Sequence, residues 1–158
     1  MNPLRRSSLV AVAIVAYCAW QARDIVGAWR HAPFDRLGWL ALLIWAFPLA
    51  WIWRREFQKN HAVGSATVLV AGLAISLLGT LGEVNALCYL GLACALAGTV
   101  SWSWVLLPWL IAGVAWMPVF GYLVSRGAAG LILPGRLLLA LAAALWLWKY
   151  KLGRPAQT

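Results

Sequence analysis

The sequence predicts an all-α integral membrane protein, a polytopic bundle of about six transmembrane helices with both termini in the cytoplasm. Three observations support this fold class. Of the 158 residues, 64% are hydrophobic and only 11% are charged, whereas a soluble domain has roughly 45–50% apolar and about 25% charged residues. The apolar residues form long runs, as a chain that crosses lipid repeatedly requires. The basic residues lie mostly at the ends of these runs.

The first apolar run follows a short basic head. We interpret it as an uncleaved helix rather than a signal peptide, because Tyr17, Trp20 and Gln21 stand where a cleavage site needs small residues. A polar connection from Arg23 to Arg36 then precedes the second run. This part of the chain is therefore expected to supply two spans and one polar loop.

The later runs are separated by short turns. The sequence Gly82-Glu83-Val84-Asn85 predicts a tight turn, because Gly and Asn accept the backbone angles of turns. Pro108 and Pro118 are expected to kink the fifth span, and residues 125–130 are expected to form a loop. Five spans and one re-entrant segment are the alternative, since spans four and six are short. The predicted spans cover residues 9–20, 37–53, 62–81, 86–100, 103–124 and 131–148.

Two features orient this bundle. With six spans, the N-terminal side collects eight basic residues: Arg5, Arg6, Arg54, Arg55, Lys59, Lys149, Lys151 and Arg154. The opposite side collects four: Arg23, Arg30, Arg36 and Arg126. The imbalance indicates cytoplasmic termini, and we expect a bacterial inner membrane. Three Trp-x-Trp pairs are expected at the cytoplasmic headgroups: Trp51, Trp53, Trp102, Trp104, Trp146 and Trp148.

No linker interrupts the chain, so residues 1–158 are read as one membrane domain. Small residues are concentrated in the third and fourth spans: Gly72, Gly79, Gly91, Ala93, Ala97 and Gly98. Small residues let helices approach closely in lipid, so these two spans are expected to pack against each other. The net charge of +9 forms no stripe along a helix face. We therefore expect lipid and other integral membrane proteins as partners, and no nucleic acid.

Arg136 is the one ionisable residue that lies clearly inside a predicted span, and such groups are functional candidates because they are costly in lipid. One interpretation is that its long side chain reaches the outer headgroups. The other is an ion pair with Glu83, which the topology places near the same face. Glu83 and Arg136 are therefore the candidate intramembrane polar pair.

The sequence contains no catalytic or cofactor motif. Cys18, Cys88 and Cys94 have no metal or redox spacing and are interpreted as small buried apolar residues. His31 and His61 fall on opposite sides of the predicted membrane, so they cannot share a metal. We therefore predict no catalytic residue, metal or cofactor.

The segments around Trp39 to Arg55 and Gly64 to Gly98, the stretch between the two prolines of span five, and Leu133-Pro134-Gly135-Arg136-Leu137 resemble the non-catalytic N-terminal half of the exosortase/archaeosortase family. That resemblance implies a multi-span membrane protein related to enzymes that process C-terminal sorting signals. The family's catalytic Cys lies in an Ala-Cys-Ser-Gly motif, but here Ala93-Cys94 is followed by Ala95-Leu96. No His follows His61, so no active-site residue carries over.

The leading functional hypothesis is a non-catalytic membrane subunit that packs against and stabilises or assembles a larger membrane protein complex. A small transporter or lipid-binding protein, with a cavity around Pro108 and Pro118, is the first alternative. An exosortase-like sorting enzyme fragment or accessory protein, with Cys88 or Cys94 as nucleophile, is the second.

Overall fold

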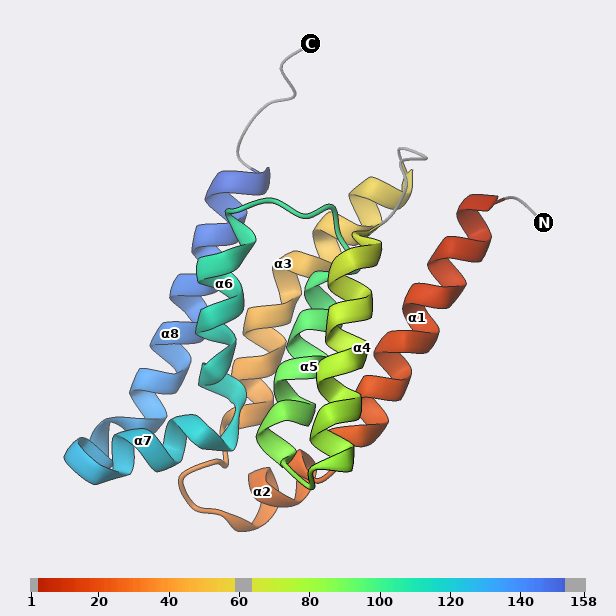
Figure 1. Ribbon diagram of the computed structural model, residues 1–158. Helices are drawn as coiled ribbons and strands as arrows, with labels where there is room; N and C mark the ends of the chain where they lie inside the picture. The colour runs from red at the N-terminus through yellow and green to blue at the C-terminus, as the bar shows by residue number, and fades with distance from the viewer. Residues whose placement is uncertain (1–2, 59–63, 153–158) are drawn as a thin grey trace. The chain divides into compact units, whose positions relative to one another are not determined.

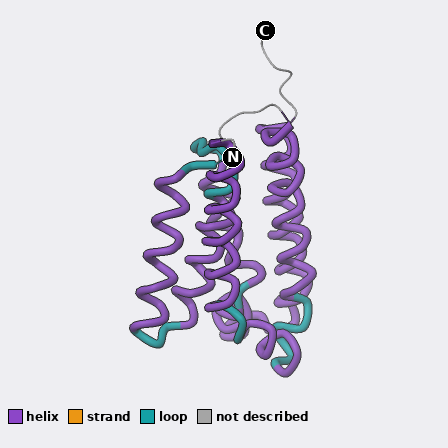
Figure 2. The backbone as a smooth tube through the Cα atoms, turned by 90° about the vertical axis from the view of Figure 1, so that its right-hand side faces the viewer, coloured by secondary structure: helices purple, strands orange, loops and turns teal. Residues whose placement is uncertain are grey.

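The computed structural model describes residues 3–58 and 64–152, and every regular element in these ranges is helical (Figures 1 and 2). The all-α prediction is therefore confirmed. Lys59, His61 and Arg154 lie outside the described residues.

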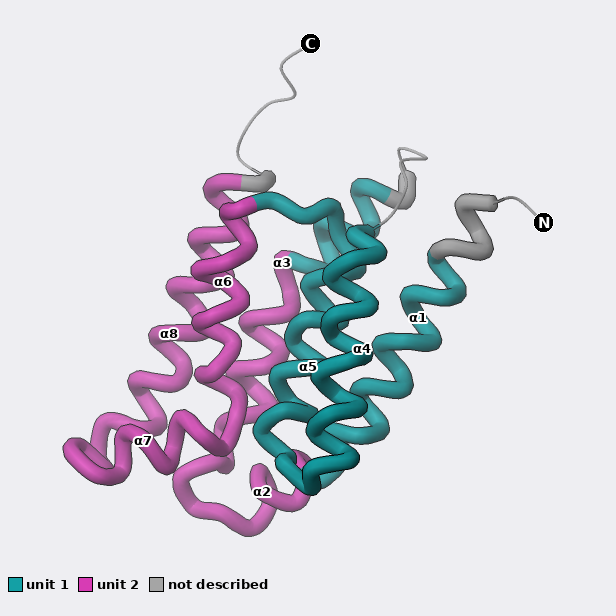
Figure 3. Tube along the Cα trace, in the orientation of Figure 1, with its two compact units in different colours: residues 1–24, 49–103 teal, residues 25–48, 104–158 magenta. Residues whose placement is uncertain are grey.

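Contacts group the chain into two compact units (Figure 3). Unit 1 consists of Met1–Asp24 and Leu49–Ser103, and unit 2 of Ile25–Pro48 and Trp104–Thr158. The segments of the two units alternate along the chain, and helix α3 (Gly38–Gln58) contributes to both. No linker in the sequence corresponds to this division, and the single domain read from the sequence stays a prediction.

The centre of unit 1 is a hairpin of α4 (Ala66–Leu81) and α5 (Asn85–Ala97). Small residues on the two helices meet in antiparallel register, Gly72 beside Ala95 and Gly91 beside Ser76. A Cβ atom added to Gly91 would lie 2.7 Å from the backbone nitrogen of Ser76, so the helix backbones are in direct contact there. This confirms the predicted packing of the two Gly-rich segments.

The turn between α4 and α5 falls where the sequence predicts it. The backbone angle that favours glycine is taken by Glu83, with φ of 54°, rather than by Gly82 or Asn85. Asn85 is instead the first residue of α5. The turn prediction is correct, but the residue that adopts the left-handed conformation is an exposed glutamate.

Two other segments complete unit 1. Helix α1 (Pro3–Gln21) packs against both helices of the hairpin, and the Cys18 thiol donates to the carbonyl of Gly72 at 4.0 Å. At the C-terminal end of α3, the Glu56 carboxylate accepts from the Ser101 amide at 3.1 Å and from its hydroxyl at 2.5 Å. This carboxylate ties the end of α3 to the segment after α5.

Unit 2 is built around α8 (Ile132–Leu147), which contacts α6 (Leu106–Ala112), the short helix η1 (Gly113–Trp116) and α7 (Pro118–Ala128). Helix α2 (Ile25–His31), the N-terminal half of α3, the short helix η2 (Ala129–Leu131) and the π-helical turn η3 (Trp148–Leu152) complete it. Within this unit, Figure 1 shows α7 running across the foot of α6 and α8 rather than along either.

The predicted fifth span, residues 103–124, is wrong as a single helix. Met117 is extended, with φ of −80° and ψ of 148°, and separates η1 from α7. Pro118 is the first residue of α7, and Pro108 lies in the first turn of α6. Proline is tolerated at such positions because a first-turn N–H has no helical partner. The two prolines therefore begin helices rather than kink one.

Two predicted loops are also partly helical. Residues 125–130, expected to be a loop, belong to the end of α7 and to η2. The polar connection from Arg23 to Arg36 contains α2. In α3, Pro48 is a true interior proline that the span prediction did not single out.

Helix lengths support fewer full-length spans than the sequence predicts. Among the described residues, one helical stretch, Pro118–Tyr150, is long and apolar enough to cross a membrane. A second qualifies only if α1 and α2 are counted together as one bent span. Three further apolar helices are shorter: Ala66–Leu81, Asn85–Ala97 and Leu106–Trp116. A membrane location therefore has support from one helix, whereas six full-length spans are not supported.

Candidate functional site

Three tryptophans that the sequence analysis did not single out form the aromatic core of unit 2. Trp45, Trp109 and Trp116 are all fully buried. The rings of Trp45 and Trp109 stack with centroids 3.9 Å apart and planes 9° apart, and Trp116 lies tilted against Trp45 at 5.9 Å. The Trp45 and Trp109 rings, and the helices that carry them, are thus held together at van der Waals distance.

The stacked pair is also joined by two reciprocal hydrogen bonds. The Trp45 Nε1–H donates to the Trp109 carbonyl at 2.8 Å, and the Trp109 Nε1–H donates to the Trp45 carbonyl at 3.0 Å. The Trp109 carbonyl lies where helical hydrogen bonding is disturbed, because the chain tightens into η1 beyond it and the Gly113 amide bonds to the Leu110 carbonyl instead. In α3, the missing N–H of Pro48 affects the carbonyl four residues earlier, that of Ile44, and not that of Trp45.

A third indole hydrogen bond joins α2 to the end of η1. The Trp29 Nε1–H donates to the Trp116 carbonyl at 3.2 Å, just before the extended Met117. In a medium without water, each free backbone carbonyl needs such a donor. The Trp45 and Trp29 indoles therefore donate to carbonyls beside the irregular backbone that divides the predicted fifth span.

Beside this core lies a buried ion pair. Arg136 on α8 is 0% exposed, and its Nη2 atom lies 2.5 Å from Oδ1 of Asp35, whose side chain is 10% exposed. Asp35 is held in the turn between α2 and α3, where its amide bonds to Ala32 and its carbonyl accepts from Gly38. The pair connects two elements 101 positions apart in sequence.

Two glycines make room for this pair. A Cβ on Gly121 of α7 would lie 2.9 Å from Asp35 Oδ1, and a Cβ on Gly38 would lie 2.9 Å from Arg136 Nη1. The guanidinium also stands over the ring of Phe120, with 5.5 Å to its centroid. We call Asp35, Gly38, Phe120, Gly121 and Arg136 the arginine cluster.

The Arg136 guanidinium is only partly satisfied by the hydrogen bonds of the arginine cluster. Arg136 Nε and Nη1 have no hydrogen-bond partner among the described residues, although all five guanidinium N–H groups are donors. Burial raises the pKa of the Asp35 carboxyl, and the Arg136 guanidinium opposes that rise. The charge on Arg136 is therefore compensated by one carboxylate and one aromatic face.

The structure gives Arg136 an acidic partner that the sequence analysis did not name. Its side chain is buried by protein, and it pairs with Asp35 rather than with Glu83 among the described residues. Glu83 is exposed in the turn between α4 and α5 of unit 1. The sequence did contain a signal for Asp35, because it lies in the polar connection from Arg23 to Arg36, which the six-span prediction puts on the same side of the membrane as Glu83. Nothing in the sequence ranked one acid above the other.

The predicted interface tryptophans are mostly exposed. Trp53 is half-buried, and the other five are exposed: Trp51, Trp102, Trp104, Trp146 and Trp148. Trp146 also donates its Nε1–H to the Val105 carbonyl at 3.1 Å. Exposure agrees with a headgroup position but does not place any of them in a membrane, so the aromatic belt stays a prediction.

The three cysteines lie in the interior of unit 1. Cys18, Cys88 and Cys94 are free and buried within unit 1, and Cys88 bonds through its sulfur to the Ser76 carbonyl at 3.8 Å. In residues 3–58 and 64–152, no three His, Cys, Asp or Glu side chains gather in one place. Pro108 is exposed in the first turn of α6 and Pro118 begins α7, so the cavity expected around a kinked fifth span stays a prediction.

Unit 2 also contains an apolar groove between α3 and α8, with a volume of about 390 Å³. This lies within the range of roughly 300–1,000 Å³ that is typical of small-ligand sites. Its lining is almost entirely apolar: Leu43, Ile44, Phe47, Pro48, Leu141, Ala144, Leu145 and Trp148. Phe47 and Trp148 stack across one end, with centroids 6.4 Å apart.

Comparison of the chain with protein-family models, curated protein sequences and solved structures gives no match. The resemblance to the exosortase/archaeosortase family therefore stays a prediction.

Proposed function

We propose that this protein is a non-catalytic integral membrane subunit that packs against and stabilises or assembles a larger membrane protein complex. The observation that carries the proposal is the groove between α3 and α8. Large side chains flank it, with Leu43 and Phe47 on α3 and Leu145 on α8 all more than half exposed. Ala144 and Pro48 supply smaller side chains between them. A helix of another subunit would place a ridge of side chains in such a groove.

The polar groups of unit 2 support the same proposal. Arg136, Asp35 and the Trp45–Trp109 pair join its helices to one another. These contacts make the unit a fixed framework on which the groove is held open. A rigid, apolar and preformed surface suits permanent packing against another membrane protein.

We further propose that the apolar elements α1, α3, α4, α5, α6 with η1, and α8 make six passes through a bacterial inner membrane. The bias of basic residues toward the N-terminal side favours cytoplasmic termini. Helix α5 has 13 residues, about 20 Å at 1.5 Å per residue, against a hydrocarbon core of about 30 Å. Most of α5 is buried by protein, so its ends need not match the lipid thickness.

The subunit role is tested by gentle extraction of the tagged chain from its native membrane, followed by native mass spectrometry. Co-migration with other membrane proteins at fixed stoichiometry is expected. Ala144→Leu fills the groove, whereas the same substitution at exposed Ala74 on α4 serves as the matched control. Ala144→Leu should reduce recovery of the partner and Ala74→Leu should not. A monomeric, partner-free chain would refute the proposal.

Lipid binding is the second candidate, and the same groove favours it. An acyl chain also fits a narrow apolar groove, and exposed Lys149 follows Trp148 at its end, where it would meet a lipid phosphate. In the same mass spectra, a bound lipid retained by the wild type and lost from Ala144→Leu, without any partner protein, would favour this candidate. Fusions of alkaline phosphatase and of green fluorescent protein to the C-terminus test the topology independently. Phosphatase activity there would place the C-terminus outside the cytoplasm.

A further inference from the structure

The helical stretch Pro118–Tyr150 is much longer than a straight helix needs to cross a membrane. Pro118–Tyr150 has 33 residues, about 50 Å at 1.5 Å per residue, whereas the hydrocarbon core is about 30 Å thick. Helices α7 and η2 account for 11 and 3 of these residues. The remaining 19 residues, 33 less 14, span about 28 Å. The part from Ile132 onward therefore suffices for the crossing.

The backbone separates α7 from this crossing part. Ala128, at the junction with η2, has φ of −155° and ψ of 66°, which is not helical. At its other end, α7 follows the extended Met117. Within unit 2, Figure 1 shows α7 lying across the foot of α8 instead of extending it. A helix in this position would run along the membrane surface if α8 crosses the membrane.

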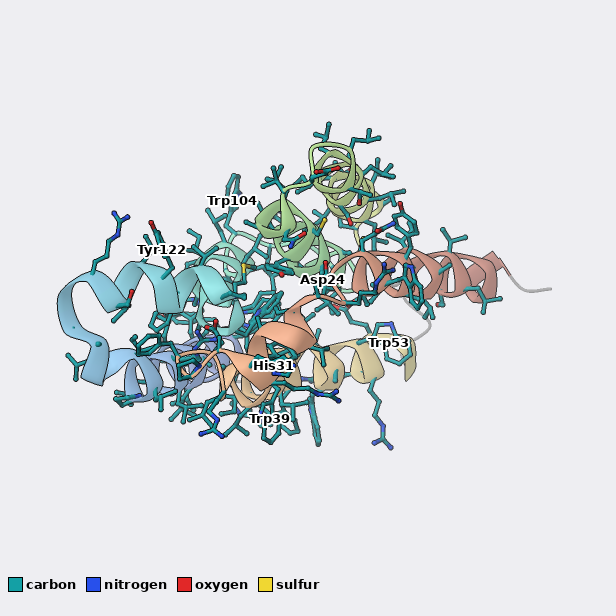
Figure 4. The ribbon with its side chains drawn as sticks, turned by 90° about the horizontal axis from the view of Figure 1, so that it is seen from below. Asp24, His31, Trp39, Trp53, Trp104 and Tyr122 are labelled. Carbon is teal, nitrogen blue, oxygen red and sulfur yellow. The ribbon has the colours of Figure 1, made fainter. Side chains whose placement is uncertain are left out.

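One side of α7 is held by the arginine cluster. Gly121 is buried against Asp35, and Phe120 lies under the Arg136 guanidinium. The opposite side is exposed, with Tyr122 at 61% and Leu123 at 60%. Figure 4 shows Tyr122 projecting from the side of α7 that faces away from α8.

The exposed side has the composition of a membrane interface. Arg126 stands over the Tyr122 ring, 4.8 Å from its centroid, and donates from Nη2 to the Tyr122 hydroxyl. Tyrosine is enriched at headgroup level, arginine binds lipid phosphate, and a leucine beside them can enter the acyl boundary. Such residues together anchor a helix surface at the level of the headgroups.

We propose that α7 is an interfacial helix that lies flat on the bilayer, with Tyr122, Leu123 and Arg126 against the lipid headgroups. Its partner is the lipid surface itself. The arginine cluster fixes α7 at the end of α8, so the depth of α7 is set by where α8 leaves the hydrocarbon core. The interfacial placement requires only that α8 crosses the membrane. If the six proposed passes and the cytoplasmic termini are also correct, α7 lies on the non-cytoplasmic side of the membrane.

A spin-label scan tests this placement in the full chain. Cys18, Cys88 and Cys94 are replaced by Ala, and single cysteines are introduced on α7 at Tyr122, Leu123 and Arg126. Reference cysteines on α8 are introduced at three exposed positions: Leu138, Leu141 and Leu145. The labelled proteins are placed in vesicles of phosphatidylethanolamine and phosphatidylglycerol. Collision of the label with oxygen and with a water-soluble nickel chelate then gives its depth.

The three α7 labels are expected at one shallow depth, at the headgroups. The α8 labels are expected to differ progressively, by about 10 Å between positions 138 and 145. A steady change of about 1.5 Å per residue along α7 would overturn the proposal, since α7 would then continue the span. Full access of the nickel chelate to all three α7 labels, or exclusion of both reagents by protein, would also overturn it. Access of the nickel chelate to the α8 labels as well would show that α8 does not cross the membrane. The proposal of a subunit role is tested separately, by recovery of the partner protein.

Discussion

Asp35 and Arg136 each compensate the buried charge of the other. A double-mutant cycle measures the free energy of this coupling. Asp35→Asn keeps the shape of the side chain but removes the charge 2.5 Å from a guanidinium that is 0% exposed. An uncompensated buried charge costs about 3–5 kcal/mol, so this variant should lose that much of its free energy of unfolding. Asp35→Asn combined with Arg136→Met contains neither charge and should come within about 1 kcal/mol of the wild type.

The single variant Arg136→Met adds a pH dependence with a defined sign. Burial raises the pKa of Asp35, and without the guanidinium nothing opposes that rise. A raised pKa favours the protonated acid in the folded state. The variant should therefore be least destabilised below the unfolded pKa of about 3.9, and it should lose stability as the pH rises through the folded pKa.

Unfolding by sodium dodecyl sulfate in mixed micelles, followed by tryptophan fluorescence, measures these differences. Arg126→Met removes an exposed arginine from the neighbouring helix and should change stability by less than about 0.5 kcal/mol. Additive effects of Asp35→Asn and Arg136→Met would refute the ion pair. If the effects of Arg136→Met and Glu83→Gln on the free energy of unfolding were instead non-additive, the ion pair predicted from the sequence would be supported.

Four further substitutions, at Trp45, Trp109, Gly91 and Glu83, are judged by the same unfolding measurement. Trp45→Phe and Trp109→Phe each leave a buried carbonyl without its indole donor and should each cost about 1–3 kcal/mol; equal stability of both variants and wild type would show that these bonds contribute nothing. Gly91→Ala forces a Cβ toward the Ser76 backbone and should cost about 1–3 kcal/mol, whereas Gly127→Ala meets nothing within 4 Å and should be close to neutral. Glu83→Gly removes the strain of a left-handed backbone conformation, which costs a non-glycine residue about 1–2 kcal/mol. The greater backbone entropy of glycine in the unfolded chain offsets about 0.5–1 kcal/mol of this gain. The variant should therefore be more stable by at most about 1.5 kcal/mol, and a loss of stability would contradict this reasoning.

The packing of α4 against α5 was predictable because it depends on a local repeat. Glycines seven residues apart, Gly72 and Gly79 on α4, and Gly91 on α5 with Gly98 at its C-terminal cap, are visible in the sequence. A short turn between them makes the antiparallel arrangement almost unavoidable. The division of the fifth predicted span was less accessible. Pro118 indicated a kink, but only the extended backbone at Met117 makes it a helix start.

What the sequence determined by itself was the all-helical class, the packing of the glycine-rich hairpin and the cost of placing Arg136 inside an apolar segment. Each follows from composition or from a period along the chain. Only the tertiary structure decided which acid meets Arg136, because Asp35 and Glu83 both lie in polar connections and sequence spacing does not rank them. The burial of Trp45 and Trp109 could not be predicted from the sequence for the same reason. Trp45 and Trp109 resemble the exposed tryptophans in sequence, and their burial results from a contact between residues 64 positions apart.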